Sequence, residues 1–358
     1  MKTSKRLRRN IAIWLAAGLF MTGTAGMAAG PIMPDPKAEA RHQPQVEETA
    51  NGIPLVNITA PSSGGVSRNE YETFNVPGKG VILNNSYTLS KTELAGYVQG
   101  NNNMAERPAK IIVNEVTGAG STSMDGFLEV AGNRADVVIA NPNGITVNGG
   151  GFINTGKAFL TTGKPVYDGE DHLQRFDITG GDILIEGKGL GGKETGSLAI
   201  LSRAVKINAG IWAKDLHITT GANTVDAKTL EASAIEGKGG HPAFALDTAA
   251  IGGMYAGRIT LVGTEKGLGV NNSGTWSAED NLTLDWNGDL KNSGTIYSKG
   301  NTDLRASCLE NDKTIAAGKD VTISADGHVA NTGTVGAGIN EAGGLTETGT
   351  LEIQSGRV

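Results

Sequence analysis

The stretch NSGTWSAEDNLTL (Asn272–Leu284) recurs along the C-terminal part of the chain. NSGTIYSKGNTDL begins at Asn292, NDKTIAAGKDVTI at Asn311 and a shorter NTGTVGAG at Asn331. These starting points are 20, 19 and 20 residues apart, and an apolar residue (Leu284, Leu304 or Ile323) lies 12 places into each of the first three copies. A fainter copy, NAGIWAKDLHI, begins at Asn208. A fixed period of this length indicates a repeat protein in which each copy is one structural unit.

A unit of this length holds two or three short strands and cannot bury its apolar side chains alone. Stacked copies bury them between neighbouring rungs, and the alternation in LTL and VTI points one face of each strand inward. Neighbouring rungs then pair as parallel strands, and parallel crossovers are right-handed by default. We therefore predict an all-β fold: a right-handed parallel β-helix, a solenoid with rungs of about 20 residues and short hairpins outside the helix.

Four asparagines begin the repeats and would lie above one another in such a stack, namely Asn272, Asn292, Asn311 and Asn331. Stacked asparagines can form an amide ladder, as they do in cross-β structures. Each could instead cap its own turn. The sequence leaves both roles open.

Composition agrees with narrow aliphatic layers joined by many turns. Hydrophobic residues make up 38% of the chain and aromatic residues only 5%, while 53 of the 358 residues are glycine. From about Ile53 onward, short β-branched runs alternate with Gly, Asn, Asp and Ser; they include KIIVNEV, FLEV, DVVIA, ITV, DILIE, LAILSRAVKI, LHITT and RITLV. Helical periodicity is nearly absent, and the best helix candidates are residues 90–97 and 227–235.

The N-terminus has the three parts of a secretory signal peptide. A basic segment, MKTSKRLRRN, precedes the apolar IAIWLAAGLF and the small-residue segment MTGTAGMAAG. We expect a signal peptide over residues 1–29, cleaved after Ala28 or Ala29. Residues 30–52 are rich in Pro and charge and predict a flexible leader. The single cysteine, Cys308, excludes an intrachain disulfide and is expected to be a small apolar core residue.

A rigid turn is expected at Asn141-Pro142-Asn143-Gly144, between a strand over Val137–Ile139 and the strand that starts at Ile145. A type I turn favours Asn at its first position, Pro at its second and Gly at its fourth. The asparagine side chain also hydrogen-bonds the backbone ahead of it. By itself this pattern indicates a turn and no function.

The same segment lies within a longer resemblance. ANPNGITVNGGGFINTGKAFLTTG (140–163), VNEVTG (113–118), GFLEVAGNRADVVIA (126–140) and FALDTAAIGGMYAGRITLVGTEKGLGVNNSG (244–274) resemble the secretion domain of two-partner-secretion exoproteins. That family contains the filamentous haemagglutinin adhesins and the contact-dependent growth inhibition proteins. Many members carry a second Asn-Pro motif upstream of the first, where this chain has Gly118-Ala119-Gly120-Ser121.

The resemblance implies a secretion domain over residues 53–270, followed by β-helix repeats over 271–358. It implies passage through the periplasm after removal of the signal peptide. A dedicated outer-membrane β-barrel transporter with periplasmic polypeptide-binding domains then exports the chain, which folds outside. The segment Asn141 to Ile145 is needed for export in the family. We expect a secreted or cell-surface adhesin with a receptor on a host or neighbouring cell; the alternative is the N-terminal export module of a growth-inhibition toxin.

Other function classes fit the sequence less well. A net charge of −6, with no basic patch beyond the first ten residues, argues against nucleic-acid binding. A β-helix polysaccharide-degrading enzyme would need clustered carboxylates, and the acidic residues here are scattered. The five histidines (His42, His172, His217, His241 and His328) lack metal-ligand spacing and are expected on the surface or in loops. We therefore expect no enzymatic activity, no metal and no cofactor.

Overall fold

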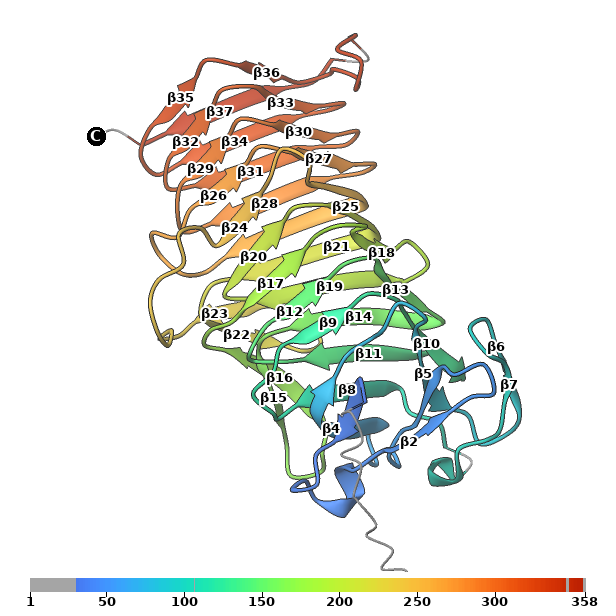
Figure 1. Cartoon of the computed structure of the whole chain (residues 1–358). Coiled ribbons are helices and arrows are strands. Elements are labelled where there is room, and N and C mark those ends of the chain that lie inside the picture. The colour runs from blue at the N-terminus through green and yellow to red at the C-terminus, as the bar shows by residue number, and fades with distance from the viewer. Residues whose placement is uncertain (1–29, 106, 346–347, 357–358) are drawn as a thin grey trace, which may run out of the picture. The chain divides into compact units, whose positions relative to one another are not determined.

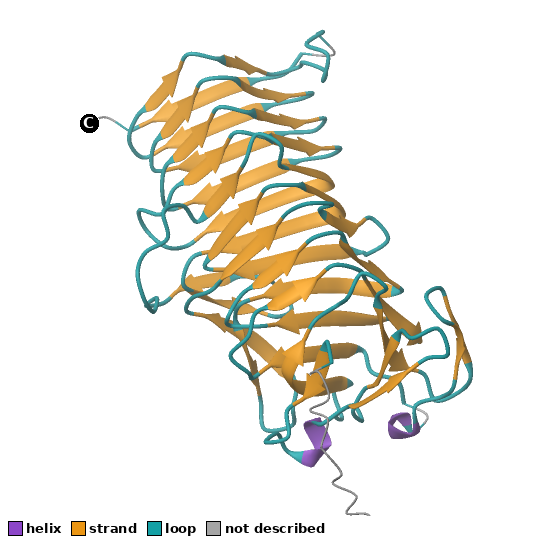
Figure 2. Ribbon diagram, in the orientation of Figure 1, coloured by secondary structure: helices purple, strands orange, loops and turns teal. Residues whose placement is uncertain are grey.

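The structure is a computed structural model that describes residues 30–105, 107–345 and 348–356. The predicted signal peptide, with Ala28 and Ala29, lies outside the described residues. Within them, regular structure consists of β-strands and two single-turn 3-10 helices, η1 (Ala40–His42) and η2 (Asn102–Met104) (Figure 2).

Most strands of residues 31–358 stack as the rungs of a parallel β-helix with three faces (Figure 1). One face is a sheet of nine strands, all paired in parallel. It consists of β9 (Thr122–Met124), β12 (Ile145–Val147), β17 (Asp182–Ile185), β20 (Ala204–Ile207), β24 (Leu246–Thr248), β26 (Val270–Asn272), β29 (Leu290–Asn292), β32 (Leu309–Asn311) and β35 (Val329–Asn331).

The other two faces share the long strands β21 (Gly210–Thr220) and β25 (Gly253–Gly263), which turn the corner between them. The first of these faces, called the long face, adds β4 (Val66–Phe74), β8 (Ile111–Val116), β11 (Ala135–Ala140), β14 (Thr155–Thr161), β19 (Ser197–Ser202), β28 (Leu282–Trp286), β31 (Thr302–Ala306), β34 (Val321–Ala325) and β37 (Leu351–Ser355). The second, called the short face, adds β3 (Pro54–Asn57), β5 (Val81–Asn85), β10 (Phe127–Gly132), β13 (Gly150–Ile153), β18 (Leu190–Gly192), β27 (Thr275–Ala278), β30 (Thr295–Ser298), β33 (Thr314–Ala317) and β36 (Thr334–Gly336).

The repeat period sets the stacking of the core. Leu284 pairs with Leu304 and Leu304 with Ile323 in neighbouring parallel strands, and these side chains are 1%, 2% and 0% exposed. The expected 12-residue offset is therefore confirmed. The same inward column runs back along the stack through Leu261, Ile218, Ile200, Leu160 and Ile139. Cys308, expected in the core, is instead half-buried in a bend.

Two antiparallel strands close the N-terminal end of the stack. β1 (Ile32–Pro34) pairs with β4, and β2 (Gln45–Glu48) pairs with β3. The structure thus corrects the expectation of a flexible leader over residues 30–52. An unpaired edge strand exposes a row of hydrogen-bonding groups, and this Pro- and charge-rich segment supplies partners for those edges despite its composition.

Both predicted helices are wrong. Residues 90–97 form most of an antiparallel hairpin, β6 (Ser90–Thr92) and β7 (Gly96–Val98). The Glu129 carboxylate accepts the backbone N–H groups of Glu93 and Leu94 at the hairpin turn, at 2.7 and 2.9 Å. Residues 227–235 hold a turn and β23 (Ala232–Ala234). Both segments therefore form β-hairpins in place of helices.

β23 belongs to a four-stranded antiparallel sheet outside the helix, with β15 (Lys164–Tyr167), β16 (Leu173–Ile178) and β22 (Asn223–Asp226). This outer sheet packs on the long face, and Phe176 and Val225 join Val138 and Ala199 in one buried cluster. The strand β11 is thus buried on both sides, because Ile139 points into the helix. That arrangement explains why its sequence from Val137 to Ala140 is continuously apolar rather than alternating.

Candidate functional site

The predicted turn connects β11 to β12 and is closed in two ways. The Gly144 N–H donates to the Asn141 carbonyl oxygen at 3.1 Å, and the Asn143 N–H donates to Asn141 Oδ1 at 2.9 Å. Gly144 has φ +110°, in the region that favours glycine, whereas Asn143 is not among the residues with positive φ. A negative φ at the third position excludes a type II turn and agrees with type I.

The turn is also fastened to the preceding rung. Asn141 Nδ2 donates to the Gly120 carbonyl oxygen at 2.9 Å and to Thr122 Oγ1 at 3.0 Å. Asn143 Nδ2 donates to the Gly118 carbonyl oxygen at 2.8 Å. The loop held in this way is the one where many members of the resembled family carry a second Asn-Pro motif. In this chain, the Asn141–Gly144 turn therefore fixes the geometry of both loops.

The next rung holds the turn from the other side. The Asn141 N–H donates to the Thr161 carbonyl oxygen at 2.9 Å, and a Cβ on Gly144 would lie 3.0 Å from the Asp182 carbonyl oxygen. Asn141 and Ile145 are buried, while Pro142 and Asn143 are exposed. The predicted segment thus has a buried half that locks three rungs together and an exposed half that another molecule can reach.

The four repeat asparagines are joined by side-chain hydrogen bonds. Asn272 Nδ2 donates to Asn292 Oδ1 at 2.8 Å, Asn292 Nδ2 to Asn311 Oδ1 at 2.7 Å, and Asn311 Nδ2 to Asn331 Oδ1 at 2.7 Å. The amide oxygens of Asn272 and Asn292 also accept a backbone N–H two residues ahead. The two roles that the sequence left open, ladder and turn cap, therefore occur together.

A second ladder was missed. Asn281 Oδ1 accepts the Asn301 N–H at 2.9 Å, Asn301 Oδ1 accepts the Asp320 N–H at 3.4 Å, and Asp320 Oδ1 accepts the Thr350 N–H at 2.8 Å. Its first three members are spaced by the same 20 and 19 residues as the repeat. The repeat period was the signal for this ladder, because Asn281, Asn301 and Asp320 occupy equivalent positions near the middle of successive repeats.

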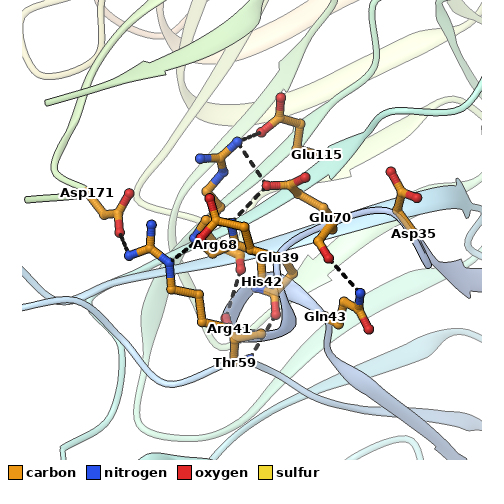
Figure 3. Close-up of polar contacts among 12 residues, drawn as sticks. Asp35, Glu39, Arg41, His42, Gln43, Thr59, Arg68, Glu70, Glu115 and Asp171 are labelled. Atoms are coloured by element: carbon orange, nitrogen blue, oxygen red, sulfur yellow. Dashed lines mark hydrogen bonds and ion pairs between the residues drawn. The ribbon is translucent and has the colours of Figure 1, made fainter. Parts of the chain in front are cut away.

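A buried polar cluster lies at the N-terminal end of the stack (Figure 3). His42 Nδ1 lies 3.0 Å from Glu70 Oε1, and Arg68 Nη2 lies 2.9 Å from the same oxygen and 3.4 Å from Glu115 Oε2. The Arg68 guanidinium also lies over the Tyr167 ring, 4.5 Å from its centroid. We call these five residues the N-terminal polar cluster. It joins η1, β4, β8 and the outer sheet.

Burial sets the ionisation of this cluster. It lowers the pKa of His42, with the nearby Arg68 charge acting in the same direction and Glu70 opposing it. Burial raises the pKa of Glu115, against the effect of Arg68. The expectation that the histidines lie on the surface or in loops is therefore incorrect for His42, which is 5% exposed and whose Nδ1 lies 3.0 Å from Glu70 Oε1. No sequence signal marked it, because its partners come from distant strands.

The described residues contain no group of three or more His, Cys, Asp or Glu residues arranged to hold a metal ion. Among the same residues, no helix combines the length and the apolar character needed to cross a membrane.

Comparison with known proteins identifies relatives of the whole described body. The family model of the TPS secretion domain matches residues 31–297. The chain is 42% identical to Toxin CdiA of Yersinia pestis and 39% identical to tRNA nuclease CdiA of Yersinia mollaretii. The two alignments cover 77% and 92% of this chain but only 9% and 12% of the two relatives.

A solved structure gives the same result. The crystal structure of the filamentous hemagglutinin secretion domain superimposes with a TM-score of 0.67 at 29% identity, and the alignment covers 92% of this chain and all of that one. The expected resemblance and the β-helix are confirmed. The chain therefore belongs to the family of TPS secretion domains, the export modules of exoproteins such as CdiA and filamentous haemagglutinin.

Proposed function

We propose that this chain is the N-terminal export module of a contact-dependent growth inhibition exoprotein. The observation that carries the proposal is its identity of 39–43% to three CdiA proteins over 77–92% of its own length. In this proposal, residues 1–29 direct the chain to the periplasm and are removed. An outer-membrane β-barrel transporter with periplasmic polypeptide-binding domains then carries the chain to the cell surface or the medium.

The second candidate is the secretion domain of an adhesin that binds a receptor on a host or neighbouring cell. The structural similarity to the filamentous hemagglutinin secretion domain supports it. The relatives named as toxins have the higher identity and therefore favour the first candidate. A neighbouring reading frame for a small protein that protects co-expressing cells would decide for growth inhibition. Both candidates share the same export step.

The fold supplies a physical basis for export without ATP. Rungs of a solenoid contact mainly their neighbours, so each rung that forms outside the cell stabilises the next and opposes backsliding. Parallel strand pairing is non-local and therefore slow, which favours an unfolded chain inside the periplasm. The only cysteine of the chain, Cys308, cannot cross-link it there.

We assign the Asn141–Ile145 segment to the start of this process. Its buried amide binds the rung before it and its backbone N–H binds the rung after it, so the turn is complete only when three rungs have met. Before export the chain is unfolded, so the transporter would meet residues 141–145 as an extended segment, and outside the cell the same segment would form the turn. Folding competence and recognition thus belong to two states of one segment.

Co-expression with the candidate transporter tests the proposal. The protein in the medium is measured for the unaltered chain and for the Asn141→Ala, Pro142→Ala and Asn292→Ala variants, with and without the transporter. Asn292→Ala is the matched control, because it also removes a buried, hydrogen-bonded asparagine but lies in the repeats. We expect secretion only with the transporter, and a loss of several-fold for Asn141→Ala but not for Asn292→Ala.

Two results would contradict the proposal. Equal release from cells without the transporter would exclude two-partner export. Equal losses for Asn141→Ala and Asn292→Ala would show that the turn acts only through general stability, which unfolding of the purified variants would measure independently.

A further inference from the structure

One column of outward-pointing positions on the short face carries exposed aromatic side chains. Parallel register places Phe127 beside Gly151, Gly151 beside Gly191, Gly191 beside Trp212, and Trp212 beside Tyr255. Phe127 is 44% exposed, Tyr255 is 39% exposed and Trp212 is half-buried. We call Phe127, Trp212 and Tyr255 the aromatic strip. The strands of this column, β10, β13, β18, β21 and β25, follow one another along the stack in Figure 1.

Glycines let two of these rings lie against the sheet. A Cβ on Gly210 would come within 2.5 Å of the Trp212 ring, and one on Gly253 within 2.8 Å of the Tyr255 hydroxyl oxygen. The planes of the two rings differ by 16°, and their centroids are 6.1 Å apart. Because Gly210 and Gly253 have no side chain, the rings pack close to them and form one nearly parallel, partly exposed aromatic pair.

A groove adjoins this surface. It has a volume of about 320 Å³, lies between Phe127 and Trp212, and includes Gly191 in its lining. Lys193 and Glu194, both exposed, also line it. The groove therefore combines aromatic walls, a position without a side chain, one hydrogen-bond donor group and one acceptor group, with no net charge.

We propose that the aromatic strip binds a neutral β-linked pyranose chain. Aromatic faces carry negative charge density and attract the weakly positive C–H groups on the flat side of a sugar ring. Binding sites of this kind use an apolar surface with a few polar groups that set orientation. In the proposed site, sugars stack on Trp212 and Tyr255, one ring enters the groove, and Lys193 and Glu194 bind its hydroxyl groups.

The balanced charge of the groove and the small area of the aromatic strip disfavour other occupants. Proteins that bind single-stranded nucleic acids on aromatic rings also need a positively charged groove, and the groove here is balanced by one lysine and one glutamate. A standard protein interface buries about 800 Å² on each partner. Three rings of about 200 Å² each, two of them roughly 40% exposed, provide far less. This inference is independent of the export proposal.

Fluorescence of the purified chain can detect the binding. Trp276 and Trp286 are 0% and 2% exposed, so Trp212 is the tryptophan of the described residues that a surface ligand can reach. We expect cellohexaose or chitohexaose at millimolar concentration to change the emission saturably. Calorimetry should show about tenfold weaker binding for Trp212→Ala and for Tyr255→Ala, a change of 1.4 kcal/mol each.

Controls make the result specific. Tyr97→Ala, which removes a ring that is 70% exposed on β7, should leave affinity unchanged. Trp212→Phe should lose the fluorescence response but retain most of the affinity. If Trp212→Ala fails to fold, the affinities of Trp212→Phe and Tyr255→Ala still test the proposal. The inference is overturned by absence of saturable binding to both sugars, or by binding that persists in the Trp212 and Tyr255 variants. Binding of phosphatidylcholine vesicles or heparin in place of the sugars, or self-association lost in Trp212→Ala, would also overturn it.

Discussion

Asn141 makes more contacts than its turn requires. Closing the turn uses its carbonyl and amide oxygens, but its Nδ2 group and backbone N–H reach two other rungs. A buried donor or acceptor left without its partner costs about 1–3 kcal/mol. This residue thus links the local turn to the stacking of the helix, and that link makes it the residue whose loss should matter most for early folding.

The asparagine ladder yields a graded prediction. Asn292 is fully buried and both donates to and accepts from neighbouring amides, whereas Asn331 is exposed and ends the ladder. We expect Asn292→Ala to lower the free energy of unfolding by about 2–3 kcal/mol, since two buried partners are orphaned. Asn331→Ala should lower it by less than about 1 kcal/mol. Denaturant titration of both variants checks this order, and equal losses would show that the ladder does not stabilise the stack.

Sequence reasoning was most reliable for individual residues that recur with the period. The inward column at Leu284, Leu304 and Ile323 followed from spacing alone, because identical rungs place identical positions in contact. The contact between His42 and Glu70 could not be predicted. The two residues come from separate segments outside the repeats, and only the folded chain brings them together.

Strands that follow from local sequence patterns could be predicted, whereas segments whose structure depends on contacts between elements could not. All eight β-branched runs singled out in the sequence lie in strands, since alternation and β-branching act locally. Residues 90–97 and 227–235 were expected to be helical and are not. The first is held as a hairpin by Glu129 from another rung. The second forms a local hairpin with β22, and its Ala227 N–H donates to the Gln174 carbonyl oxygen of the outer sheet.

The hairpin offers a direct test of this explanation. Glu129 is buried and its carboxylate accepts two backbone N–H groups of the β6–β7 turn. Glu129→Ala should loosen the hairpin while the helix stays folded, because among the described residues β6 and β7 pair with each other and with no strand of the stack. Hydrogen exchange should then accelerate over residues 90–98 by at least about tenfold, the effect of losing roughly 1.4 kcal/mol. Unchanged protection there would contradict the assigned role of Glu129.

Stability should fall in mild acid because of two histidines. Burial lowers the pKa of His42 and of His217 below the ordinary value of 6.5, so both stay neutral in the folded state. The unfolded chain takes up protons first as pH falls below 6.5. The stability from these neutral groups is therefore complete above 6.5 and is lost as pH falls through the lowered pKa values.

The slope of this loss is at most about 1.4 kcal/mol per pH unit for each histidine. Unfolding titrations between neutral pH and pH 5 check it, and the double variant His42→Gln/His217→Gln should show a smaller slope. The raised pKa of Glu115 makes stability rise as pH falls, which opposes the effect of the histidines. Because Glu115 is present in both the unaltered chain and the double variant, it does not affect the comparison of their slopes. An equal slope in the two proteins would contradict this assignment.

The molecule as a whole is a stack of rungs closed at its N-terminal end. β1 and β2 pair antiparallel with the first strands of the stack, β4 and β3, and later rungs repeat with little change. The period predicted the repeated part, and the resemblance predicted the export function. The N-terminal closure escaped prediction because a strand that pairs once, in antiparallel sense, leaves no periodic signal.

The central claim is that the stack forms only after the chain has crossed the outer membrane unfolded. A covalent link between adjacent rungs tests it. Ser273 Oγ and Ser293 Oγ lie 3.1 Å apart on neighbouring rungs, a separation compatible with a disulfide at these positions. In a Cys308→Ser background, Ser273→Cys/Ser293→Cys would close a loop that cannot pass a transporter as a single extended chain.

The decisive measurement is the amount of this double-cysteine variant secreted by transporter-bearing cells, with and without a reducing agent in the medium. The single-cysteine variants serve as controls. We predict several-fold less secretion under oxidising conditions and recovery on reduction. Equal secretion of the oxidised, cross-linked chain would contradict unfolded passage and folding outside the cell.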